Sequence, residues 1–181
     1  NLDTNTCVQC QSATDCKDAT ASRCDLITST CVPCLAEADC KEIPGKQICD
    51  KGACVQCTGT QYQGICGTLD SKDLVCDSAT RTCTTDRKAA SVDVCQPCVS
   101  DAECMPGRAC LSQVFRGKPV GNFCFWKQGD TENGAPADCT LPTNIPYVNP
   151  IEVTSLDGAT GTFCTLAVST CVAMNQFRTV E

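Results

Sequence analysis

Apolar and polar positions follow different patterns in the two parts of the chain. Beyond residue 110, short runs rich in aromatic and β-branched residues predict strands at 120–126, 151–155, 162–169 and 171–174. Phe123 and Phe125 alternate, so they fall on one face of their strand. The intervening segment 127–150 contains glycine and four prolines, which predicts a loop. The last part of the chain is therefore expected to be a module with a small β-rich core.

The earlier part repeats cysteines instead. The stretch CVQCQSATDC at 7–16 returns as CVPCLAEADC at 31–40 and, changed in its second position, as CQPCVSDAEC at 95–104. Counted along the chain, the cysteines form units of four. Each CxxC joins the last cysteine of one unit to the first of the next, which is typical of a repeat array.

These units define the expected domain organisation. We predict a small disulfide-rich, elongated repeat array of short β-hairpins and single helical turns, with little regular secondary structure and a C-terminal β-rich module. Its parts are repeat 1 at 1–33, repeat 2 at 34–56, repeat 3 with a linker at 57–94, repeat 4 with a long loop (111–123) at 95–127, and the module at 128–181.

Two local elements recur within a unit. The residues before the second cysteine predict one helical turn, and Ser100 with Glu103 fits a capping box. The last two cysteines flank a hairpin, clearest at Lys51-Gly52, where glycine suits a tight turn. Four or six residues separate them, so with a two-residue turn they lie opposite each other and project from one face.

This geometry favours pairing the first cysteine with the third and the second with the fourth, among the three connectivities that four cysteines allow. The candidate pairs are Cys10–Cys24, Cys16–Cys31, Cys34–Cys49, Cys40–Cys54, Cys57–Cys76, Cys66–Cys83, Cys98–Cys110 and Cys104–Cys124. Cys164 and Cys171 resemble the hairpin of a fifth unit that Cys139 and Cys95 would complete. Cys7 is left over as a free thiol, a remnant of a longer chain or a bridge to another subunit.

Composition agrees with a crosslinked framework. The 181 residues include 21 cysteines, whereas Leu, Ile, Val and Phe make up less than a fifth of the chain, and the net charge is −7. Without crosslinks such a chain would be expected to stay disordered. Disulfides imply an oxidising compartment, extracellular or at the cell surface. No apolar run is long enough to span a membrane, the polar start lacks a signal peptide, and we expect a mature or excised chain. The acidic balance argues against nucleic acid and anionic membranes as partners.

Several chemistries are excluded or disfavoured. The chain has no histidine, which excludes haem attachment, Cys2His2 zinc, and cysteine or serine proteases that use histidine. Thiol redox catalysis or structural zinc at the CxxC motifs is weaker than a disulfide role, because the motifs repeat at unit junctions. We expect no cofactor and no catalytic residues.

Two weaker candidate sites remain. Asp130, Glu132 and Asp138 could hold calcium, although the segment lacks the order of an EF-hand and a solvated loop is favoured. Phe125, Trp126 and Tyr147 are candidate anchors for a partner, since aromatic residues dominate binding hot spots. Core packing is the favoured role of Phe123, Phe125 and Trp126.

The cysteine pattern resembles a known class of repeat. The segments CVPCLAEADCKEIPGKQICDKGACVQC and CVQCTGTQYQGICGTLDSKDLVCDSATRTC are similar to cysteine-rich repeats of myxobacterial and related bacterial surface and secreted proteins. The resemblance covers about 7–110, with an echo at 164–171. It implies extracellular stalks or adhesive arrays without a catalytic role, and it is silent on 125–163.

We therefore predict a non-enzymatic extracellular structural or adhesive protein, a disulfide-stapled rod for cell-surface architecture. Its expected partners are proteins, including copies of itself, and self-assembly into a fibre could use strand addition at 1–6 and 177–181 with Cys7 as a lock. The alternative is a secreted module that binds glycan or calcium through its aromatic C-terminal part.

Overall fold

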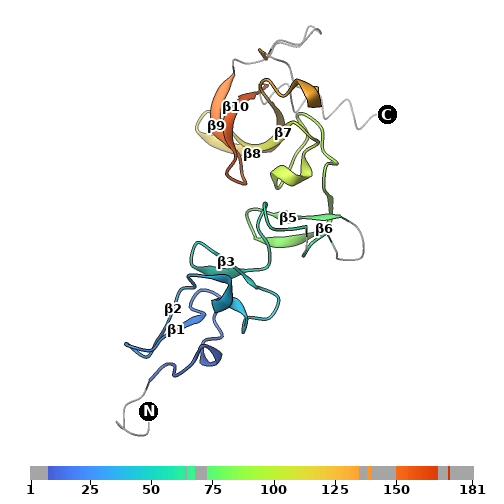
Figure 1. Ribbon diagram of the computed structural model, residues 1–181. Helices are drawn as coiled ribbons and strands as arrows, with labels where there is room; N and C mark the ends of the chain where they lie inside the picture. The colour runs from blue at the N-terminus through green and yellow to red at the C-terminus, as the bar shows by residue number, and fades with distance from the viewer. Residues whose placement is uncertain are drawn as a thin grey trace. The chain divides into compact units, whose positions relative to one another are not determined.

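The computed structural model describes residues 8–63, 65–67, 73–134, 138–139, 150–166 and 171. The chain forms two compact units, Asn1–Thr58 and Gly59–Glu181 (Figure 1). Regular structure in the described residues consists of short antiparallel hairpins, 3-10 turns and one four-stranded sheet, held by ten disulfides. The predicted small disulfide-rich fold is thus confirmed.

The N-terminal unit contains two copies of one motif, a 3-10 turn followed by a two-stranded hairpin. The first copy is η1 (Ala13–Asp15), β1 (Arg23–Asp25) and β2 (Thr30–Val32), and the second is η2 (Glu37–Cys40), β3 (Ile48–Asp50) and β4 (Ala53–Val55). Cys24 lies opposite Cys31, and Cys49 lies opposite Cys54, as the even spacing predicted. Lys51 and Gly52 both have positive φ, 51° and 83°, which is the backbone that a tight hairpin turn requires.

Sulfur replaces hydrocarbon in the core of this unit. One buried cluster consists of Cys34, Cys40 and Cys54 with Ile43, against which Ala19 packs. The backbone N–H of Cys54 also donates to the Ala19 carbonyl at 2.7 Å, which ties the second hairpin to the first copy of the motif. A unit with so little aliphatic surface depends on its crosslinks for stability.

The second unit combines one further two-stranded hairpin, β5–β6, with a four-stranded sheet. Its elements are β5 (Leu74–Asp77), β6 (Thr82–Lys88), η4 (Asp101–Glu103), β7 (Arg108–Phe115), β8 (Lys118–Lys127), η5 (Thr131–Asn133), β9 (Ile151–Thr154) and β10 (Thr160–Cys164). The strand order of the sheet is β7-β8-β10-β9, and all its pairs are antiparallel (Figure 1). The sheet therefore joins the segments predicted as the fourth repeat and the C-terminal module.

Aromatic residues build the core of the second unit. Phe123, Phe125 and Phe163 pack in one cluster with Leu111 and Leu166, and the exposed fraction of the Phe125 side chain is 0%. Phe123 and Phe125 share a face of β8, as their alternation predicted. The expected small β-rich core is present.

The boundaries of several elements differ from the prediction. The loop predicted at 111–123 is wrong, because these residues belong to the β7–β8 hairpin, the longest in the described residues. Its turn is Arg116-Gly117, and the register shift between Gln113 and Val114 absorbs the odd number of residues between Cys110 and Cys124.

The other predicted strands correspond to β8, β9 and β10. The last of these ends at Cys164, and residues 167–169 lie outside the described part of the chain. Of the strand predicted at 171–174 only Cys171 is described, and it is not in a strand.

Candidate functional site

The cysteines, the richest source of candidate chemistry, are committed to disulfides. The structure confirms the predicted pairing of the first cysteine with the third and the second with the fourth. These disulfides are Cys10–Cys24, Cys16–Cys31, Cys34–Cys49, Cys40–Cys54, Cys66–Cys83, Cys98–Cys110 and Cys104–Cys124. Cys57 and Cys76 are disulfide-bonded as well, and every other described cysteine has its partner elsewhere, so they bond to each other as predicted.

The fifth unit pairs in another way. Cys95 bonds Cys171, and Cys139 bonds Cys164. The first cysteine of this set therefore pairs with the last, in contrast to the other four repeats. Cys164 belongs to β10, which pairs with β8 and so places Cys164 in the sheet, opposite Trp126. Cys7 lies outside the described residues. All twenty described cysteines are disulfide-bonded.

Sulfur atoms cluster inside each of the first four units. Three Sγ atoms lie within 4.8 Å of one another in each of the sets Cys10/Cys16/Cys31, Cys34/Cys40/Cys54, Cys57/Cys66/Cys83 and Cys98/Cys104/Cys110. Zinc binds the thiolate form of cysteine, and a disulfide sulfur offers no thiolate. In this oxidised state the clusters are adjacent disulfides, in accordance with the structural role expected for the CxxC motifs.

An acidic residue organises each short turn. The Asp15 carboxylate accepts the backbone N–H groups of Gln11 at 2.8 Å and Ser12 at 2.9 Å, and these bonds hold the pKa of Asp15 below its usual range. Asp39 accepts the equivalent N–H groups of Leu35 and Ala36. These carboxylates therefore stabilise the turns by accepting hydrogen bonds from backbone N–H groups.

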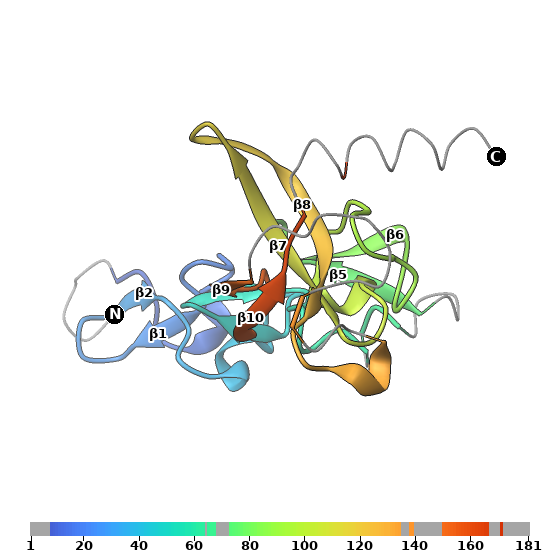
Figure 2. The ribbon, with the colours of Figure 1, turned by 90° about the horizontal axis from the view of Figure 1, so that it is seen from above.

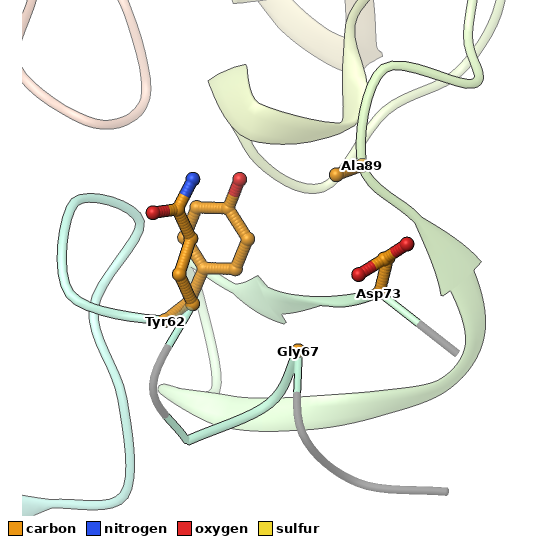
Figure 3. A pocket seen from close by; sticks show the side chains of 5 residues that line it. Tyr62, Gly67, Asp73 and Ala89 are labelled. Atoms are coloured by element: carbon orange, nitrogen blue, oxygen red, sulfur yellow. The ribbon is translucent and has the colours of Figure 1, made fainter. Parts of the chain in front are cut away.

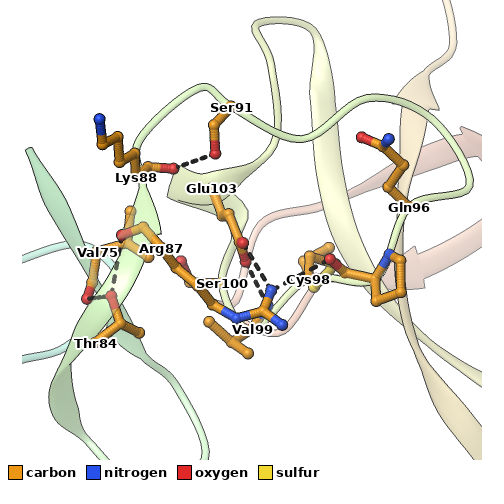
Figure 4. A network of polar contacts seen from close by, with 12 residues as sticks. Val75, Thr84, Arg87, Lys88, Ser91, Gln96, Cys98, Val99, Ser100 and Glu103 are labelled. Atoms are coloured by element: carbon orange, nitrogen blue, oxygen red, sulfur yellow. Dashed lines mark hydrogen bonds and ion pairs between the residues drawn. A yellow bond between two sulfur atoms is a disulfide. The ribbon is translucent and has the colours of Figure 1, made fainter. Parts of the chain in front are cut away.

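The equivalent residue of the fourth unit, Glu103, corrects the predicted capping box. Its Oε2 accepts the N–H of Val99 at 2.9 Å, one residue before the expected donor, and the Ser100 side chain makes no capping hydrogen bond. The other oxygen, Oε1, pairs with Arg87 of β6 at 2.7 Å (Figure 4). The exposed fraction of the Glu103 side chain is 2%. A buried carboxylate therefore joins the β5–β6 hairpin to the fourth unit.

A second polar junction is built around two carboxylates. The Asp157 carboxylate, in the turn between β9 and β10, accepts the Ser78 hydroxyl and the backbone N–H of Asp101 at 2.6 Å. The Asp101 carboxylate accepts the Ser155 hydroxyl and the N–H of Cys110 at 2.9 Å. Burial raises the pKa of Asp101, and the negative charge of Asp157 adds to the rise. Three of these four bonds connect residues more than 50 positions apart.

The second unit also contains a pocket. Its volume is about 370 Å³, and it is lined by Tyr62, Gln63, Gly67, Asp73 and Ala89. Figure 3 shows the Tyr62 ring on one side of the pocket, with Asp73 and Ala89 across from it. An aromatic ring beside an amide and a carboxylate offers a stacking face and hydrogen-bonding groups, a combination suited to a small polar ligand. The sequence did not indicate this site, because its lining residues, from Tyr62 to Ala89, come together only in the folded chain.

The predicted partner anchors lie in different environments. Phe125 is fully buried, so its prediction as a surface anchor is wrong, and its side chain stabilises the core instead. Trp126 is half-buried against that core, and the Arg108 guanidinium lies 5.2 Å from its ring centroid. Tyr147 lies outside the described residues.

The weak calcium candidates are not assembled into a site. Among the described residues, no set of three ligand atoms includes Asp130, Glu132 or Asp138. Asp130 instead accepts the side-chain amide of Asn133 at 2.9 Å, a local contact of the η5 turn.

Comparisons with known proteins add no relatives. No protein-family model matches the chain, and neither curated proteins nor solved structures give a significant match. The resemblance to myxobacterial surface repeats stays an expectation drawn from the sequence.

Proposed function

We propose that this protein is a non-catalytic structural or adhesive component of an extracellular surface, in which disulfide-stapled repeats act as a stalk. The observation that carries the proposal is that all twenty described cysteines are disulfide-bonded. In the N-terminal unit, cysteines also make up most of a buried core cluster. Disulfides in this number indicate an oxidising compartment. In the described part of the chain, no helix has the length and apolar character needed to cross a membrane.

The polar groups support the same role. Asp15 and Asp39 hold backbone N–H groups, Glu103 pairs with Arg87, and Asp157 joins two distant segments. Each acidic side chain thus performs a structural task that a larger apolar core would otherwise perform. A surface stalk needs this resistance to unfolding and proteolysis more than it needs a preformed catalytic cleft.

Labelling of intact source cells tests the location and the role. Antibodies to the folded protein are expected to label the surface of unpermeabilised cells, and brief surface proteolysis is expected to spare the epitope unless a reductant is present. Label only after permeabilisation, or equal proteolysis with and without reductant, would contradict the proposal.

The pocket favours a second candidate function, binding of a saccharide by the third repeat. Tyr62 provides the aromatic face, and Asp73 and Gln63 provide the polar groups (Figure 3). Screening the folded protein against a glycan array, beside a Tyr62→Ala variant, tests this function. Binding that requires Tyr62 would support it, and an array without signal would refute it.

A further inference from the structure

The distal part of the β7–β8 hairpin exposes apolar side chains. β10 pairs with β8 only at Trp126 and Lys127, so between Ser112 and Gly121 no further strand pairs with the hairpin among the described residues. Figure 2 shows this ribbon projecting beyond the rest of the sheet. We call residues 114–120 the hairpin tip. The exposed fractions of its apolar side chains are 61% for Val114, 54% for Phe115 and 39% for Val120.

The core of the second unit does not account for these side chains. Val114 and Phe115 are neighbours in a strand, so they project to opposite faces of the ribbon. The buried stripe of β7 ends at Leu111. Because apolar side chains lie on both faces of the projecting ribbon, a partner's pocket that encloses the tip would cover them, whereas a flat surface would cover only one face.

The charge of the hairpin is opposite to that of the remainder of the chain. Between Glu103 and Asp130 there is no acidic residue, whereas Arg108, Arg116, Lys118 and Lys127 are basic. The net charge of −7 for the chain therefore divides into +4 for this segment and −11 for everything else. The Arg116 guanidinium lies 5.3 Å from the Phe115 ring centroid, so cation and aromatic ring are presented together.

We propose that the hairpin tip docks into an acidic surface of a second copy of this chain. This inference rests on the proposed scaffold function and names a contact through which the scaffold assembles. The remainder of the chain supplies the complementary charge. It also supplies exposed apolar groups beside carboxylates, as at Leu26 and Ile27, which are 70% and 95% exposed next to Asp25. A contact between two different surfaces of identical chains propagates into a filament unless it closes into a ring.

The arrangement of the tip favours a protein partner over a lipid surface. Arg116 and Gly117 form the turn, so a charged side chain leads and the apolar side chains follow. A bilayer would receive that charge first, and charged groups are disfavoured in hydrocarbon. An acidic pocket on a protein instead pairs with Arg116 and Lys118 while its walls cover Val114 and Phe115.

Sedimentation velocity of the intact chain over a broad concentration series, at low and high salt, tests the proposal. Wild type is expected to self-associate, more weakly at high salt. R116E/K118E and F115S are each expected to weaken association at least about tenfold. K41E/K46E is the matched control: it makes the same charge change at two exposed lysines of the N-terminal unit and, because it adds to the acidic charge outside the tip, is expected not to weaken association. Unchanged fluorescence of Trp126 verifies folding of the variants in the second unit, and an unchanged far-UV circular dichroism spectrum verifies folding of K41E/K46E.

Three results would overturn the proposal: a wild type that stays monomeric, equal weakening by R116E/K118E and K41E/K46E, or a monomer that binds vesicles containing anionic lipid through the tip. None of these would alter the surface labelling that tests the scaffold function, so the two proposals fail separately.

Discussion

The disulfide between Cys95 and Cys171 offers a sharp test of how crosslinks stabilise the second unit. It joins positions 76 residues apart and lies in the aromatic cluster, whereas Cys98–Cys110 spans 12 residues. All four side chains are at most 4% exposed, so replacing either pair by alanine leaves buried space of a similar kind. The two double variants therefore differ mainly in the length of the loop that the lost crosslink had closed.

The other disulfides shorten the loop that Cys95–Cys171 closes. With Cys104–Cys124 and Cys139–Cys164 intact, the path from Cys95 to Cys171 shortens from 76 to about 31 residues. The loop-entropy relation then assigns nearly 4 kcal/mol to Cys95–Cys171 and about 3 kcal/mol to Cys98–Cys110. We expect C95A/C171A to lower the free energy of unfolding by about 0.8 kcal/mol more than C98A/C110A does.

The single tryptophan of the chain provides the assay. Trp126 lies in β8 and packs against the aromatic cluster, so denaturant unfolding followed by its fluorescence reports on this unit. Both variants must be measured with the remaining disulfides intact. A larger loss for C98A/C110A, or no loss for C95A/C171A, would refute the loop-length reasoning.

Three further predictions concern the polar junctions, each followed by the fluorescence of Trp126. Glu103→Gln leaves Arg87 without its buried anionic partner, and because Arg87 is 37% exposed we expect a loss of about 1–3 kcal/mol; the exposed Glu132→Gln should change little. The pKa of Asp101 is raised by folding, so the native state binds more protons than the unfolded state and stability falls as pH rises from about 4 toward neutrality. Asp101→Asn should remove that part of the pH profile, and an unaltered profile would contradict the assignment. Gly59→Ala places a methyl group against the Asp157 carboxylate and should destabilise the unit by at least about 1 kcal/mol. Gly161→Ala should be milder, because its methyl group meets the flexible Lys127 side chain at 3.3 Å and the Phe163 ring only at ordinary van der Waals distance.

Local spacing accounts for what the sequence predicted correctly. Even numbers of residues between the last two cysteines place Cys24 opposite Cys31 and Cys76 opposite Cys83, and the pairing follows from this geometry. The short turns before the second cysteines follow from local capping chemistry. Both signals lie within about 20 residues, where chain geometry leaves few alternatives.

Local spacing does not predict contacts between segments that are distant in the sequence. Nothing in the neighbourhood of Glu103 indicates Arg87 as its partner, and Asp101 meets Asp157 only because the β9–β10 turn folds back onto η4. β7 was missed because Ser112 and Gln113 interrupt its apolar pattern. Pro119 and Gly121, which suggest a loop, are tolerated in a ribbon beside a bulge.

The disulfides also indicate which part of a hairpin can be replaced with little effect on stability. In each hairpin the two opposed cysteines lie near the base, and in the β7–β8 hairpin the contribution to the core ends one pair further on, at Leu111 and Phe123. In the β7–β8 hairpin, Cys110 and Cys124 are buried, while Ser112 and Asn122 form a hydrogen bond at 2.8 Å on the exposed side. Replacing residues 113–121 by a two-residue Asn-Gly turn preserves that pair and the base. We expect the free energy of unfolding to change by less than about 1 kcal/mol, because a two-stranded ribbon adds little stability by itself. Self-association should nevertheless be lost, and a large destabilisation would instead mean that the hairpin tip is required for folding.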